Sequence, residues 1–150
     1  MALITVTQWK TITNAATVVG ITTPSDEDVT AGIDASDIQA EVLEQASDWV
    51  QEFATSVGVT LTAANITAAM RRRVAVAASY YAAIRKPEYR NADGKSPFHV
   101  DFAIAESELT AWADRNRNIS SDTAVTPPGV VTLDEDDAST AWAFGVSVQE

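Results

Sequence analysis

A single stretch sets the fold class: SDIQAEVLEQASDWVQEFAT, residues 36–55. Its apolar side chains recur at the three- and four-residue intervals of one helix face, which predicts an amphipathic helix. These residues are Ile38, Val42, Ala46, Trp49 and Phe53. Ser36, followed three residues later by Gln39, matches a capping box at the helix start. Gly58 is a good terminator, so we expect the helix to end near it.

Two further helices are predicted downstream of this stretch. The first begins near Thr62 and ends before Pro87, because proline disfavours helical backbone in the residue before it. Its apolar face comprises Ile66, Met70, Ala77, Tyr81 and Ile84. The second is capped by Ser96, has Pro97 at its first helical position, and ends near Asn116. Its apolar face comprises Phe98, Phe102, Ala105, Leu109 and Trp112.

The N-terminal region has a less regular pattern. Residues 4–19 predict one short helix, ended by Gly20 and Pro24. One side of that helix is formed by Trp9, Ile12 and either Val18 or Val19. Residues 22–32 are polar and acidic, and they predict a loop between this helix and the one that follows.

The character of the sequence changes after Asn118. Residues 126–129, TPPG, cannot be helical. Further on, Trp142, Phe144, Val146 and Val148 alternate with other residues at period two, which predicts a strand. We therefore expect a mainly α fold, with a small bundle of three to four helices over residues 1–118 and an extended C-terminal β-arm over residues 119–150.

The arm has one apolar face and an unpaired backbone, so it needs support from elsewhere. One interpretation pairs it with residues 130–133 as a hairpin that packs on the helices. The other, which we favour, is strand addition to a partner protein or a neighbouring copy, with the aromatic side chains as anchors. The predicted partner-interface residues are then Trp142, Phe144, Val146 and Val148.

The charge balance is strongly acidic, with a formal net charge of −11 and only three lysines, Lys10, Lys86 and Lys95. Such a chain repels nucleic-acid phosphates on average. The composition suits either an ordinary acidic protein or one that works in concentrated salt, where screening weakens the repulsion among carboxylates. Cysteine is absent, so disulfides and cysteine metal sites are excluded. We expect neither a signal peptide nor a membrane span.

Three consecutive arginines, Arg71, Arg72 and Arg73, lie in the middle helix, where successive side chains point about 100° apart. They therefore cannot form one basic face. Counted from Ile66, Arg73 falls near the centre of the apolar stripe, which predicts a buried or interface charge, whereas Arg71 and Arg72 point outward. A buried guanidinium needs a carboxylate, and we expect one of Glu41, Asp48 and Glu52. The alternative role for Arg73 is contact with a partner or with DNA phosphate.

No motif for catalysis or cofactor binding is present, whether phosphate loop, dinucleotide fingerprint or nucleophile elbow. The acidic run at residues 134–137 fails the calcium-loop pattern, because position six is Ser139 and position twelve is Gly145. We therefore expect a non-enzymatic protein without a cofactor or metal.

The order of these segments resembles a known family. An acidic loop ends in Gly32-Ile33-Asp34, an amphipathic helix follows over residues 37–55, and a later helix carries RRRVAVAASYY, residues 71–81, before a turn and a final helix. This layout is similar to the small head–tail connector (adaptor) proteins of tailed viruses. The likeness spans residues 5–117 and rests on helix order, lengths and pattern.

The resemblance implies a ring of twelve copies beneath the portal protein, at the head–tail junction (neck) of the virion. Such rings dock on the portal by an extended C-terminal segment, carry later neck or tail proteins, and let DNA pass through the lumen without sequence-specific binding. The low lysine content would then suggest a virus of a salt-loving host. The alternatives are a small DNA-binding regulatory protein that reads through Arg71–Arg73, or another neck component such as a stopper or tail-terminator ring.

Overall fold

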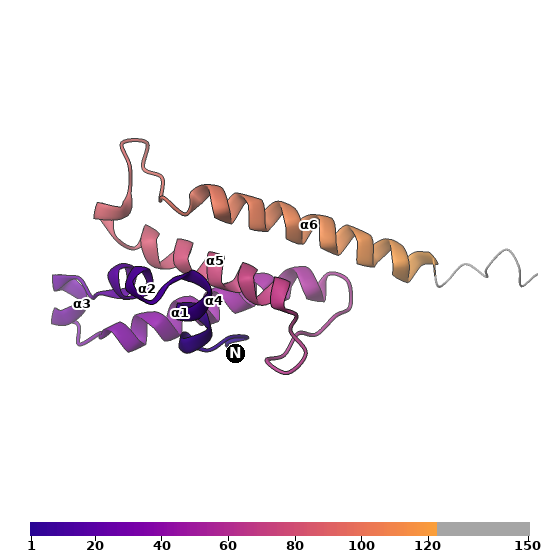
Figure 1. The fold of residues 1–150 in the computed structure, drawn as a ribbon, viewed down its shortest axis with the longest axis horizontal. Coiled ribbons are helices and arrows are strands. Elements are labelled where there is room, and N and C mark those ends of the chain that lie inside the picture. The colour runs from indigo at the N-terminus through magenta and orange to yellow at the C-terminus, as the bar shows by residue number, and fades with distance from the viewer. Residues whose placement is uncertain (123–150) are drawn as a thin grey trace, which may run out of the picture. The chain divides into compact units, whose positions relative to one another are not determined.

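A computed structural model describes residues 1–122, with side chains described up to residue 117 (Figure 1). Its helices are α1 (Val6–Thr13), α2 (Ala15–Thr22), α3 (Asp26–Thr30), α4 (Ala35–Thr55), α5 (Ala68–Ile84), the short 3-10 helix η1 (Pro87–Tyr89) and α6 (His99–Asp122). Residues 1–122 contain no strand, so the mainly α prediction is confirmed for this part of the chain. The predicted strand with Trp142, Phe144, Val146 and Val148 lies outside the described residues.

Residues 1–115 form one compact unit. Within it α4 and α5 run antiparallel, and α1 and α2 pack on them to complete what we call the central body. The faces of α5 in this core consist largely of small buried side chains, which let neighbouring helix backbones approach closely. These are Ala75, Ala77, Ala78, Ser79, Ala82 and Ala83.

Buried hydrogen bonds tie the N-terminal helices to the rest of the central body. The indole Nε1 of Trp9 donates to Ser79 Oγ at 3.0 Å, and Ser79 in turn donates to the carbonyl of Ala75. Gln39 Nε2 on α4 donates to Thr22 Oγ1 on α2 at 2.9 Å. Polar groups inside a core are favourable only when paired, so these bonds select one arrangement of α1 and α2.

The single N-terminal helix predicted for residues 4–19 was wrong, because α1 and α2 meet at a break at Asn14. This residue has φ 123° and ψ 130°, and its side chain accepts a hydrogen bond from the backbone N–H of Ala16 at 2.8 Å. The break rotates the two apolar sets relative to each other. Trp9 and Val18 are fully buried, whereas Ile12 and Val19 are 40% and 53% exposed.

The prediction that Gly20 ends a helix was wrong, because this glycine lies inside α2. The hydroxyl of Tyr89 lies only 3.0 Å from the place where a Cβ would stand on this glycine. Lys86 Nζ donates to the carbonyl of Gly20 at 3.1 Å. The glycine therefore serves close packing of the segment after α5 on α2. The loop predicted for residues 22–32 also contains a helix, the short α3, whose Ser25 cap completes a capping box with Asp28.

The start of α4 lies earlier than predicted, because Asp34 is its cap and Ser36 is not. The Asp34 carboxylate accepts from the backbone N–H groups of Ser36 at 2.7 Å and Asp37 at 3.0 Å, and Asp37 accepts from the N–H of Asp34. Hydrogen bonds from the Ser36 side chain, then from these backbone groups, lower the pKa of Asp34. At the other end, Gly58 has φ 74° and the N–H of Val59 bonds to the carbonyl of Ala54, so the predicted terminator is confirmed.

The bounds of the next two helices also differ from the prediction. Helix α5 begins at Ala68 with Thr67 as its cap, later than the predicted start near Thr62. The preceding turn is held by Gln51, whose side chain bonds to the backbone of Leu61 and Val59. Helix α6 begins at His99, so the prediction that Pro97 occupies its first helical position was wrong, although Ser96 Oγ accepts a hydrogen bond from the N–H of Phe98 in the turn before the helix. Helix α6 then continues to Asp122, beyond the predicted end near Asn116.

Helix α6 joins the central body through large side chains rather than close backbone approach. Phe102 stacks on Tyr80 with ring centroids 4.2 Å apart and on Trp49 with centroids 4.8 Å apart. Leu109 is fully buried in the core. Two helices separated by rings in this way leave room for a groove between them, and one lies between α5 and α6.

Candidate interaction surfaces

The most distinctive charged surface is a row of five carboxylates along α4, which we call the acidic row. Its residues recur at three- and four-residue intervals and all are exposed: Asp37, Glu41, Glu44, Asp48 and Glu52. At a rise of 1.5 Å per residue the row is about 22 Å long. Like charges at this spacing destabilise a helix. Helix α4 is therefore stabilised by burial of its opposite face. The acidic row does not stabilise the helix, so its presence needs another explanation.

Two cations neutralise part of the acidic row. Arg85 forms ion pairs with Glu41 and with Asp28, the latter at 3.5 Å. The N-terminal amine lies 3.1 Å from Glu44 and 3.8 Å from Asp48. All of these groups are near water, where such pairs contribute little. The row thus keeps a net negative charge.

The acidic character extends past α4 to Glu106 on α6. Between them lies Tyr81, whose pKa is raised by burial first and then by the negative charges of Glu52 and Glu106. Trp49 lines the same surface depression as this tyrosine and packs edge-on against Phe53. Carboxylates from two helices thus surround one patch of aromatic surface.

Arg73 lies where two helices meet, with only 16% of its side chain exposed. Its Nε and Nη2 both lie 3.2 Å from a carboxylate oxygen of Glu108 on α6. The predicted partners Glu41, Asp48 and Glu52 were wrong. The cause is the facing helix: the prediction assumed that Arg73 meets α4, whereas its side chain lies against α6, which carries Glu108.

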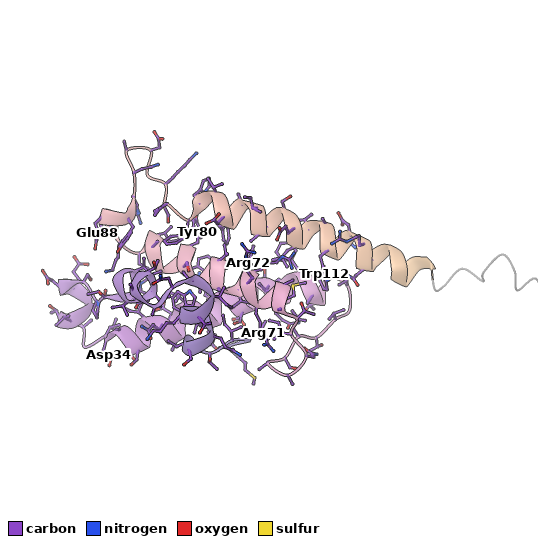
Figure 2. All side chains as sticks on the ribbon, viewed as in Figure 1. Asp34, Arg71, Arg72, Tyr80, Glu88 and Trp112 are labelled. Carbon is purple, nitrogen blue, oxygen red and sulfur yellow. The ribbon has the colours of Figure 1, made fainter. Side chains whose placement is uncertain are left out.

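The neighbouring arginines lie on opposite sides of α5, as Figure 2 shows. Arg72 is exposed on the side toward α6, and within the part of the chain described here its guanidinium has no hydrogen bond or ion pair. Arg71 lies against α1, and its Nε is buried without a hydrogen-bond partner among the described residues. The three side chains therefore do not combine into one basic surface.

A groove of about 440 Å³ runs between α5 and α6, and we call it the α5/α6 groove. Its apolar lining comes from both helices and comprises Ala69, Val76, Ile104 and Ala105, while Arg72, Arg73, Asp101 and Glu108 form its polar part. The outer face of α6 adds more apolar surface, because Ile104 and Val100 are 52% and 65% exposed. The apolar stripes did not predict this groove. The four-residue spacing of Val100 and Ile104, opposite the buried stripe, was the available signal.

Comparisons with models of known protein families, with curated proteins and with solved structures found no match. Across residues 1–122, no helix has the length and apolarity that a membrane crossing requires. The same described residues bring together no group of three or more histidine, aspartate or glutamate side chains that could hold a metal ion.

Proposed function

We propose that this chain is a non-enzymatic structural subunit of a ring at the head–tail junction of a tailed virus, an adaptor below the portal through which DNA passes. The acidic row is the observation that carries the proposal. Duplex DNA carries one negative charge per about 1.7 Å of its axis. A ring lined by such rows would repel the phosphates and let the duplex slide without adhering. The helix order that resembles the connector family adds support.

A second line of support is the separation of unlike surfaces on one subunit. A closed ring of identical copies uses head-to-tail contacts, in which each copy presents one surface and receives another. The acidic row is carried by α4, whereas the α5/α6 groove combines apolar side chains with two arginines and two carboxylates, and among the described residues the guanidinium of Arg72 has no ion pair. Two surfaces of different chemistry meet the requirement for such a contact. The copy number of twelve, the portal protein and later neck proteins as partners, and the location in the virion neck are parts of this proposal.

Electron microscopy of the purified full chain, alone and mixed with portal protein, tests the proposal. We expect rings with a central channel, either from the chain alone or on the portal. A chain that stays monomeric at high concentration and does not bind the portal would refute it. The position of the ring relative to the portal also separates an adaptor from a stopper or tail-terminator ring.

The arm is tested by a chain that ends before Ser139. We expect it to keep its helical circular dichroism and to lose its place in the assembly. If the shortened chain unfolds instead, the C-terminal residues belong to its own core and the proposed role of the arm fails.

The role of the acidic row is tested by reversing its charge at Glu44, Asp48 and Glu52 to lysine. We expect the variant to retard duplex DNA in a gel, with affinity that falls steeply as salt rises, while the parent chain does not. A matched control reverses three exposed acids elsewhere: Asp26, Glu27 and Asp93. Equal DNA binding by both variants would mean that net charge alone matters. Binding of DNA by the parent chain would favour the regulatory alternative.

A further inference from the structure

We infer that a pocket between α1 and the start of α5 binds a small carboxylate that carries an apolar chain, with Arg71 as the cation that recognises it. We call this space the α1/α5 pocket. It has a volume of about 310 Å³ and is lined by Thr7, Gln8, Thr11, Ile12, Ala68 and Arg71. The inference goes beyond the proposed ring function, because it concerns a free ligand and a surface that the ring proposal does not use.

The guanidinium of Arg71 lacks an acceptor among the residues that the structure describes. Its Nε is buried, and within this part of the chain it is the one buried side-chain nitrogen or oxygen without a hydrogen-bond partner. Buried polar atoms are almost always paired, because an unpaired donor costs free energy. Arg73 on the same helix shows the usual arrangement, since it pairs with Glu108. A bound carboxylate would supply the acceptor that Arg71 lacks.

The charges at the start of α5 also favour an anion there. Helix starts usually carry acidic side chains, because the helix dipole is positive at that end. The first turn of α5 has no acidic residue, and three arginines occupy residues 71–73. Breaks of such a local rule are expected at functional sites. An anion beside Ala68, the first residue of α5, would offset both the helix dipole and the charge of Arg71.

The lining of the α1/α5 pocket selects both the charge and the apolar part of the ligand. Arg71 is its only charged lining residue, whereas the α5/α6 groove holds two arginines and two carboxylates and so selects neither sign of charge. The apolar wall comes from Ile12, which is 40% exposed, and from Ala68. The volume of about 310 Å³ is at the lower end of the roughly 300–1,000 Å³ typical of ligand sites, which suits a small molecule.

The two ends of the ligand meet different parts of the pocket. The carboxylate takes the Nε and Nη2 edge of Arg71, which offers two parallel hydrogen bonds. Because Nε is covered by neighbouring atoms, the guanidinium turns toward the opening as it binds. Gln8 accepts from the N–H of Thr5 through its side-chain oxygen at 2.9 Å, which leaves its amide nitrogen to donate to the ligand. The apolar chain lies on Ile12.

NMR titration of the full ¹⁵N-labelled chain with hexanoate tests the inference. Burial slows exchange of the Arg71 Nε–H with water, so its side-chain resonance reports the ligand directly. We expect this resonance and the backbone amides of Gln8, Ile12 and Ala68 to shift together, with a dissociation constant on the order of 1 mM. Hexan-1-ol lacks the charge and sulfate lacks the apolar chain, so each should bind at least about tenfold more weakly. Absence of a saturable shift at these residues, or equal affinity for hexanoate and either other compound, would overturn the inference.

Matched variants make the test specific to the α1/α5 pocket. Arg71→Gln removes the charge, and Ala68→Phe fills part of the pocket while the arginine stays in place. Each should weaken hexanoate binding by at least about tenfold. The controls are Arg72→Gln and Ala69→Phe, which change the same residue types on the side of α5 toward α6 and should leave the affinity unchanged (Figure 2). Circular dichroism establishes that every variant is folded. Unchanged affinity in either folded pocket variant would refute the site.

Dilution of the chain without hexanoate identifies the source of the carboxylate. We expect the Arg71 Nε–H resonance to stay constant over the dilution series, because only added ligand fills the pocket. A shift that depends on chain concentration would mean that a carboxylate of another copy occupies the pocket, and it would overturn the assignment to a free ligand. Ring formation is scored separately by microscopy, so failure of this inference and failure of the ring proposal are distinguishable.

Discussion

The central body and α6 are built by different means, although both contribute to one core. In the central body, alanines on α5 let helices approach closely, and buried hydrogen bonds such as Trp9 to Ser79 fix their arrangement. Helix α6 is held instead by stacked rings, by the buried side chain of Leu109 and by the ion pair between Arg73 and Glu108. Stacked side chains tolerate small shifts that a buried hydrogen bond does not. The comparison teaches that α6, which lines the α5/α6 groove, is the element most able to adjust when a partner binds.

The largest effect should come from removing a buried side chain that stabilises the central body. Trp9→Ala deletes a fully buried ring and leaves Ser79 without its indole donor. We expect a loss of about 3–5 kcal/mol in the free energy of unfolding, because the cavity adds to the lost burial. Urea denaturation followed by circular dichroism measures it. Thr11→Ala, on the exposed side of α1, is the control and should change stability by less than about 0.5 kcal/mol.

The corresponding change in α6 is Leu109→Ala, which also removes a fully buried side chain. We expect a smaller loss of about 2–3 kcal/mol, toward the low end for such substitutions, because α6 can shift to fill part of the cavity. Hydrogen exchange sharpens the comparison: amides of α6 should lose protection first, while those of α4 and α5 keep theirs. Equal loss of protection in all three helices would show that α6 is not separable from the central body.

A third test concerns the buried hydrogen bond itself. Ser79→Ala leaves the indole N–H of Trp9 without its acceptor, which should cost about 1–2 kcal/mol. In the double variant with Trp9→Phe, which has no N–H to satisfy, the penalty for Ser79→Ala should largely disappear. Additive losses in this cycle would mean that the bond does not contribute to stability.

The ion pair on α6 should contribute less than any of these. Glu108→Gln removes the charge that faces Arg73, and we expect a loss of about 0.2–1 kcal/mol because Glu108 is exposed to water. The loss should shrink as sodium chloride is raised, since salt screens exposed pairs. Glu106→Gln, two residues away on α6, serves as the control and should not show the same salt dependence.

The smallest expected effect is a pH dependence at the start of α4. The pKa of Asp34 is lowered by hydrogen bonds that favour its charged form, so its contribution is present above the ordinary pKa of 3.8 and is lost as pH falls through the lowered value. Asp34→Asn keeps a capping side chain without the charge. We expect a small loss of stability at neutral pH, which disappears as pH falls below 3.8 through the lowered pKa, so that the variant loses less stability in acid than the parent chain does. If the free energy of unfolding depends on pH below 3.8 in the same way in variant and parent, this carboxylate has no role in acid stability.

The three long helices were predictable because each carries a regular apolar stripe. The caps were less so: Ser36 and Asp34 are both good capping residues, and only the folded backbone shows that Asp34 accepts the bonds. The partner of Arg73 could not be found by counting turns along one helix, because Glu108 lies on α6 and only the packing shows which helix Arg73 faces. The α5/α6 groove depends on which faces of two helices meet. This is decided by packing and cannot be read from the apolar stripe of a single helix.

Asn14 joins α1 to α2 with φ 123° and ψ 130°, a backbone outside the left-handed helical region that asparagine tolerates and one that residues other than glycine rarely adopt. One position thus governs the angle between two helices, and mutational tolerance there should be narrow although the side chain is exposed. In a saturation library selected for folding, glycine is the replacement we expect to survive best, and valine, isoleucine and threonine should be eliminated. Related sequences that keep the break between α1 and α2 can therefore vary widely on their surface while position 14 stays almost fixed.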